Sequence, residues 1–206
     1  MARTRSVSAA LLVPILFSTA VAAENWPQWR GPGGQGVSRE QSVPTDWQPD
    51  RHIAWKVPVP SGHSSPAVWG DRLFVTAAIE GEVLPGKKAV EHMMEGKPWV
   101  HPDSVAADRK HIFKVLSIDA KTGGTVWQQT AYEGPVYDAR HRESSFAGPT
   151  PATDGEMVFA YFGPEAGPQH EVVRTNSVGE PVMSSPAIAN GRIYIRGQRH
   201  LFAIGS

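Results

Sequence analysis

One short pattern occurs three times without gaps, and it constrains the fold more than any other feature of the sequence. Each copy starts with Ser or Thr followed by Pro and Ala, and then has an apolar segment, a two-residue turn and a segment rich in β-branched and aromatic residues. Gly or Asn in the turn supplies the positive φ that a tight hairpin requires. Pro at the start of the first strand removes no interior hydrogen bond. The pattern predicts β-hairpins at 65–75, 150–160 and 185–195.

A second pattern supplies the other half of a repeated unit. Residues 115–127 have the pattern of a strand, a turn and a strand, and the first of these strands recurs at 201–204. Together the two patterns make a unit of four antiparallel strands. Four-stranded sheets repeated about every 40 residues are the blades of a β-propeller. We therefore predict an all-β fold of four-stranded blades.

The strand-turn-strand segment carries a family resemblance. Asp119, Thr122, Gly123 and Trp127 fit the signature A-x-D-x-x-T-G-x-x-x-W of quinoprotein-like (pyrroloquinoline-quinone-like) β-propellers, with Ser117 at the alanine position. The resemblance implies that Asp119 and Thr122 secure the turn. It also implies that Trp127 is a docking tryptophan, buried between neighbouring blades. These four residues form the expected structural repeat motif.

The ends of the chain complement each other. Residues 53–59 have the pattern of a fourth strand without the other three, whereas the unit that begins at residue 184 lacks a fourth strand. We expect 53–59 to complete that unit, because shared blades hide edge strands. The expected layout is a strap at 24–52 and a partial β-propeller at 53–206, with a closing strand (53–59), a first blade (64–130, insertion 79–110), a partial blade (147–183) and a C-terminal blade (184–206). We therefore expect an incomplete propeller that is shortened or internally deleted; the alternative is a small β-sandwich.

Residues 1–23 have the features of a secretory signal peptide. Arg3 and Arg5 precede an apolar run that ends in small residues. The run is shorter than the roughly 20 residues of a membrane-spanning helix, and no later segment is apolar enough to span a bilayer. We expect cleavage before Glu24, with the site after Ala22 as the alternative, and a periplasmic or extracellular location. The segment at 26–32 also resembles the start of exported family members.

Composition excludes several classes of function. The formal net charge is +0 and the pI is about 7.1, so no basic surface is expected to bind nucleic acid. The absence of cysteine excludes disulfides, thiolate metal sites and a cysteine nucleophile. No hydrolase, protease, nucleotide-binding or EF-hand motif occurs.

Two loops that precede predicted first strands contain candidate ligand-binding residues. In quinoprotein-like propellers such loops surround the central channel that holds the cofactor. His63, Arg142 and Ser145 are the candidates for contact with an anionic ligand, Arg through its fork of donors and Ser through its hydroxyl. The alternative interpretation is that these loop side chains only satisfy backbone groups.

The insertion contains residues that bind metals in other proteins: His92, Met93, Met94, His101 and Asp103, with His111 close behind. Such a mixture suits copper or zinc. However, the spacing of these residues matches no compact ligand pair. We interpret the segment as a solvated lid and expect no metal site and no catalytic residue.

The leading functional hypothesis is a non-catalytic binding or scaffold module, similar to outer-membrane assembly propellers. It would bind protein partners, or further copies of itself, through open blade faces lined by residues such as Phe159 and Tyr161. No cofactor is expected. The resemblance also implies an alternative, a dehydrogenase of alcohols or sugars, or its remnant, that uses pyrroloquinoline quinone with calcium.

Overall fold

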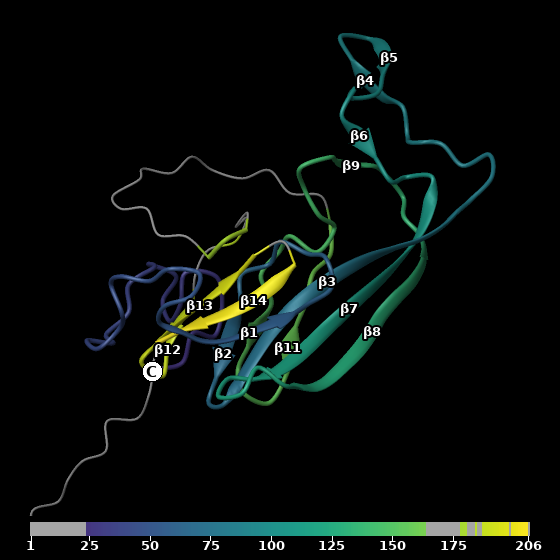
Figure 1. The fold of residues 1–206 in the computed structure, drawn as a ribbon. Coiled ribbons are helices and arrows are strands. Elements are labelled where there is room, and N and C mark those ends of the chain that lie inside the picture. Colours follow the sequence, from purple (N-terminus) through teal and green to yellow (C-terminus); the bar gives the residue numbers. More distant parts are fainter. Residues whose placement is uncertain (1–23, 164–177, 181–183, 185–186, 198, 206) are drawn as a thin grey trace, which may run out of the picture.

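A computed structural model describes residues 24–163, 178–180, 184, 187–197 and 199–205 of the chain (Figure 1). Within these residues the protein is all-β, in several small antiparallel sheets, none of them closed. The predicted leader lies outside the described residues, as do parts of the predicted blades at 147–183 and 184–206. No helix in the described part of the chain has the length and apolar character needed to cross a membrane.

The central sheet has the strand order β2-β3-β7-β8. Strands β2 (Ala67–Trp69) and β3 (Arg72–Val83) form the first predicted hairpin, with Gly70 in the turn at φ 54°. Strands β7 (Arg109–Asp119) and β8 (Thr125–Pro135) form the second half of the unit. The hairpin pattern at 65–75 and the strand-turn-strand pattern at 115–127 therefore lie together in one complete four-stranded sheet.

The turn between β7 and β8 is built by the predicted motif residues. The Asp119 carboxylate accepts hydrogen bonds from the backbone N–H of Lys121 (3.0 Å) and from the N–H (2.8 Å) and hydroxyl (2.9 Å) of Thr122. These donors of Thr122 lower the pKa of Asp119. Gly123 has a φ of 77°, a backbone angle that residues with a Cβ rarely adopt. The turn is thus held locally by its own side chains.

The insertion between β3 and β7 is shorter than the predicted insertion at 79–110. Strand β3 continues to Val83 and β7 already begins at Arg109, because the two strands remain paired as far as these two residues. The chain between them includes a small hairpin that extends away from the sheets (Figure 1). Its strands are β4 (His92–Met94) and β5 (Lys97–Trp99), and the following β6 (Ser104–Val105) pairs with β9 (Arg140–His141).

The C-terminal sheet contains strands from both ends of the described chain, in the order β1-β14-β13-β12. Strand β1 (Ile53–Pro58) pairs antiparallel with β14 (His200–Ile204), which is the pairing expected for 53–59. The other two strands are β12 (Ala187–Ala189) and β13 (Arg192–Arg196). Figure 1 shows β1 running beside β14 in this sheet.

A third sheet has only two strands among the described residues, β10 (Ala152–Thr153) and β11 (Val158–Phe159). Strand β2 lies next to β10 on one side and next to β12 on the other. The hairpin turns also contact one another: the Asn190 side chain donates to the Gly70 carbonyl (3.0 Å), and the Trp69 ring packs against Gly155. The three hairpins therefore lie side by side, in the order C-terminal, central, two-stranded.

The main core lies between the C-terminal and central sheets, and Trp55 of β1 packs at its margin. The Trp55 indole N–H donates to the Ala120 carbonyl (3.1 Å), and a Cβ on Gly123 would lie 2.8 Å from the Trp55 ring. The glycine therefore makes room for the tryptophan of the adjacent sheet.

Trp127 does not have the buried position that the resemblance implied. It is 41% exposed, and its ring contacts Phe74 of its own sheet. The physical reason is that Trp127 lies on the edge strand β8, which has no neighbouring strand on its outer side among the described residues. The prediction of a buried docking tryptophan is wrong for Trp127, whereas Trp55 has the packing expected of one.

The strap lies along the free edges of two hairpins. Trp26 is buried and exchanges two backbone hydrogen bonds with Val68 of β2 (2.9 and 2.7 Å). The Thr153 N–H of β10 donates to the Pro27 carbonyl (2.9 Å). The strap also covers the far face of the C-terminal sheet, through Val43 and Trp47.

Candidate functional site

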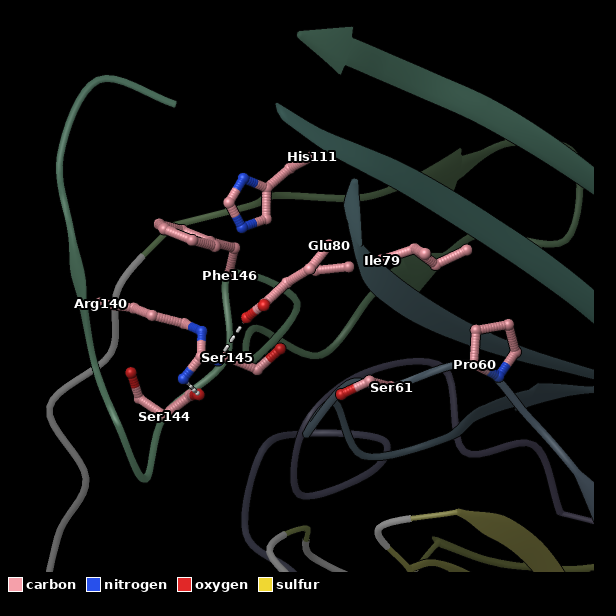
Figure 2. A pocket seen from close by; sticks show the side chains of 10 residues that line it. Pro60, Ser61, Ile79, Glu80, His111, Arg140, Ser144, Ser145 and Phe146 are labelled. Atoms are coloured by element: carbon pink, nitrogen blue, oxygen red, sulfur yellow. Dashed lines mark hydrogen bonds and ion pairs between the residues drawn. The ribbon is translucent and has the colours of Figure 1, made fainter. Parts of the chain in front are cut away.

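A polar hollow of about 340 Å³ lies where the extended part of the central sheet meets the loop after β9 (Figure 2). This volume is at the lower end of the range for small-molecule sites. Strands β3 and β7 supply one wall and the loop at 144–146 supplies the other. The lining residues are Pro60, Ser61, Ala78, Ile79, Glu80, His111, Arg140, Ser144, Ser145 and Phe146.

Arg140 organises this hollow. One guanidinium nitrogen donates to the carbonyls of His141 (3.1 Å), Arg142 (3.1 Å) and Ser144 (3.0 Å), and the other donates to the Glu80 carboxylate (2.7 Å). Burial raises the pKa of Glu80, but Arg140 and then Arg109 outweigh that effect and lower it. Glu80 is therefore an anion held between two cations, and most donors of Arg140 are occupied by the protein itself.

His111 is the polar lining residue that lacks matched partners. Its side chain is 1% exposed, and neither ring nitrogen makes a hydrogen bond of ordinary geometry with the described residues. The Phe146 ring packs against the His111 ring in an edge-to-face arrangement, with 4.8 Å between the ring centroids. Burial lowers the pKa of His111, although the Glu80 charge and the Arg109 carbonyl act in the opposite direction. The ring is therefore neutral at pH 7, with one donor and one acceptor.

The three ligand candidates from the sequence do not converge. Ser145 is buried in the wall of the hollow, where its hydroxyl oxygen accepts the Ala147 N–H (3.1 Å). The backbone N–H of His63 donates to the Ala147 carbonyl (2.9 Å), but its side chain does not line the hollow. Arg142 points to Asp103 and its side chain is 62% exposed. The arginine at the hollow is Arg140, and the sequence pattern could not distinguish it from Arg142, two residues away.

Arg196 is a second cation, close to the loop before β2, and no sequence pattern had indicated it. Arg196 is 1% exposed and pairs with no carboxylate among the described residues. Its guanidinium donates to the carbonyls of Thr76 (2.7 Å) and Pro60 (2.6 Å), and burial lowers its pKa to about 10. Burial, and then the charge of Arg196, lower the pKa of His63. Arg196 thus fastens the loop before β2 to the C-terminal sheet.

The second candidate site is an aromatic surface on the central sheet. Trp127 and Tyr132 both lie on β8, and their cross-strand partners place them on the same face as Phe74 and Phe113. We call the surface formed by Trp127, Tyr132 and the nearby Tyr137 the open face, because all three side chains are exposed. A groove of about 510 Å³ adjoins it, lined by Phe113, Tyr132, Pro135, Val136, Tyr137, Asp138, Phe146, Phe162 and Gly163.

Comparison with protein families, curated proteins and solved structures found no match. The function must therefore be inferred from the geometry of this chain.

Phe159 and Tyr161, the residues predicted to line an open blade face, are both exposed. They are not among the three residues that define the open face described above.

The potential metal ligands of the insertion, for which no metal site was expected, lie in two separate groups in the structure. His92 pairs with Asp138 (2.7 Å), whereas His101 and Asp103 meet His141, with ligand atoms within 4.8 Å of one another. A metal-bound imidazole normally donates its second N–H to an acceptor. Here Nδ1 of His101 accepts the Asp103 N–H (3.0 Å), and Nδ1 of His141 likewise accepts a backbone N–H (3.2 Å). The Asp103 carboxylate also pairs with the Arg142 guanidinium. The group of His101, Asp103 and His141 therefore fits an ion-pair network better than a metal site.

Proposed function

We propose that this chain is an exported, non-catalytic binding module: a shortened β-propeller of the quinoprotein-like type that presents its open face to a protein partner. The observation that carries the proposal is the contrast between two tryptophans. Trp55 packs against the turn of a neighbouring sheet, whereas Trp127 is exposed. A cluster of exposed aromatic side chains on one surface, such as Trp127 with Tyr132 and Tyr137, is typical of an interaction site.

The arrangement of the sheets supports the propeller over the sandwich. The first hairpins of three successive units lie side by side, with β2 between β10 and β12. The N-terminal β1 completes the C-terminal sheet, which is how propellers join their two ends. A sandwich of three hairpins requires neither feature.

The polar hollow supports a role without catalysis. A general base needs a pKa near the working pH and a lone pair that faces the substrate. Glu80 has a lowered pKa and two arginine partners. His111 is enclosed beneath Phe146. Because the charged groups here satisfy one another, the hollow resembles a structural ion-pair network, and the open face is the better candidate for binding.

The proposal is tested against the quinone-dependent alternative by incubating the purified protein with pyrroloquinoline quinone and calcium. We expect no stoichiometric quinone absorbance after gel filtration and no dye-linked oxidation of alcohols or sugars. A known quinone-dependent dehydrogenase, carried through the same steps, is the positive control. One bound quinone per chain would overturn the non-catalytic proposal.

A further inference from the structure

We propose that the aromatic groove beside the open face binds a small organic cation of the quaternary ammonium class, with choline as the test compound. The groove has a volume of about 510 Å³, which lies within the range of small-molecule sites. The inference goes beyond the proposed function, because the ligand is a small molecule and not a protein. It follows from the aromatic walls of the groove and from the charge and hydrogen bonds of its described lining residues.

Aromatic rings form most of the groove, and Phe113 lies at their centre. The centroid of its ring is 5.5 Å from that of Tyr132 and 4.9 Å from that of Phe162. The Phe146 ring lies 5.9 Å from Phe113, and Tyr137 also lines the groove. Because Phe113 and Phe146 are buried, packing holds their rings in place. Aromatic faces attract cations electrostatically, so these walls favour a cation over an anion.

Asp138 is the only charged side chain among the described residues that line the groove. Its carboxylate accepts the backbone N–H of Ala139 (2.7 Å) and pairs with Nε2 of His92 (2.7 Å), and these contacts fix its orientation. Arg140, two residues further along the chain, lines the polar hollow instead and pairs with Glu80. The groove therefore combines aromatic rings with one carboxylate, which is complementary in charge to an organic cation.

The hydrogen-bonding groups of the groove favour a quaternary over a primary ammonium ion. The Tyr132 hydroxyl already donates to the Pro135 carbonyl (2.6 Å), and both Asp138 oxygens have the partners given above. The Gly163 N–H donates to the Phe146 carbonyl (2.8 Å). A primary ammonium ion carries three donors that need acceptors once they lose water. A trimethylammonium group has no N–H, so apolar contact and negative charge are sufficient for it.

Choline and its uncharged isostere 3,3-dimethylbutanol, which has carbon in place of nitrogen, are a matched pair of probes. The protein is labelled with 3-fluorotyrosine, and each ¹⁹F resonance is assigned by substituting that tyrosine with Phe. Tyr132 and Tyr137 report on the groove, whereas Tyr194, which is buried in the main core, is the internal control. The titrations are made at about pH 8, where an ordinary imidazole is neutral, so that His92 does not offset the Asp138 charge.

We expect choline to shift the Tyr132 and Tyr137 resonances saturably and to leave Tyr194 unchanged. Choline should bind about tenfold more tightly than its isostere, because only choline carries the charge. Equal affinities would show that the groove recognises apolar surface alone, and the absence of a saturable shift would show that it binds no such ligand; either result overturns the proposal. A second copy of the chain in the groove would instead make the resonances depend on protein concentration and not on choline, which also contradicts it.

The variant Asp138→Asn keeps the size of the side chain and removes its charge. We expect its affinity for choline to fall about tenfold while that for the isostere is unchanged. Asp71→Asn is the matched control, because it removes a carboxylate that pairs with Lys121 in the β2–β3 turn, outside the groove. Equal affinities of the two variants for choline would contradict the role of Asp138.

If Asp138→Asn does not fold, as judged by circular dichroism, Phe162→Leu tests the aromatic wall. This change should weaken choline binding severalfold more than binding of the isostere, since it removes a ring but keeps apolar volume. Equal weakening of both probes would mean that the ring acts only through its apolar surface, contrary to the proposal. These outcomes do not depend on the quinone assay or on a protein partner.

Discussion

The indole N–H of Trp55 donates to the carbonyl of Ala120, 65 positions along the chain and in a different sheet. This bond, with the packing against Gly123, joins the strand contributed by the N-terminal part of the chain to the central sheet. We expect Trp55→Ala to lower the free energy of unfolding by about 3 kcal/mol, as for loss of a packed aromatic side chain.

The matched variant is Trp127→Ala, which removes the same side chain from an exposed position. We expect it to cost about 1 kcal/mol or less, since surface substitutions have small effects. Reversible denaturant unfolding of both variants measures the difference. Equal losses would mean that Trp127 is covered in solution.

The open face is expected to cause self-association of the isolated protein. Exposed aromatic clusters favour association, and β8 is an edge strand that carries no lysine or arginine to discourage pairing with another chain. Light scattering at micromolar concentration should give a mass above that of one chain. Replacing Trp127 and Tyr132 with Gln should restore the mass of a single chain, whereas a monodisperse wild-type monomer would favour the compact sandwich.

Arg140 is expected to contribute far more to stability than Arg142. Arg140→Ala removes the donors that hold the loop carbonyls and Glu80, and hydrogen bonds to charged groups contribute about 1.5–3 kcal/mol each. We expect a loss of about 2 kcal/mol. Arg142→Ala breaks only an exposed ion pair with Asp103 and should change stability by less than about 0.5 kcal/mol. The reverse order in denaturant unfolding would contradict the assigned roles.

The buried His111 predicts a loss of stability in mild acid. Its pKa in the folded state is below its ordinary value of 6.5, so the unfolded chain binds protons first. The free energy of unfolding should therefore decrease as the pH falls below 6.5 toward the lower pKa of the folded state. The charged groups around the ring are Glu80, Arg109 and Arg140.

The variant His111→Phe tests this assignment. It should reduce the decrease between pH 7 and pH 5, as measured by denaturant unfolding at each pH. Some decrease should remain, because the pKa of His63 is also lowered. An unchanged pH profile in the folded variant would show that His111 is not the group responsible.

The predicted leader can be tested directly by sequencing the N-terminus of the exported protein. We expect the mature chain to begin at Glu24, or at Ala23 if cleavage follows Ala22. Recovery of Met1 from a periplasmic fraction would contradict the prediction of a cleaved signal peptide.

Local features of the fold could be predicted from the sequence because they depend on residues close together in the chain. Gly70 supplies the positive φ of a hairpin turn, and Asp119 and Thr122 close their turn with their own side chains. The pairing of 53–59 with the C-terminal strands was also predictable, since each end of the chain has the strands that the other lacks.

Only the tertiary structure decided which side chains are covered. Trp55 and Trp127 lie on equivalent outer strands, but among the described residues only Trp55 is covered by the turn of a neighbouring sheet. Arg140 and Arg142 are separated by one residue, yet only Arg140 reaches Glu80, which lies 60 positions away along the chain. Burial and ion pairing depend on contacts between distant segments, and a local pattern contains no information about them.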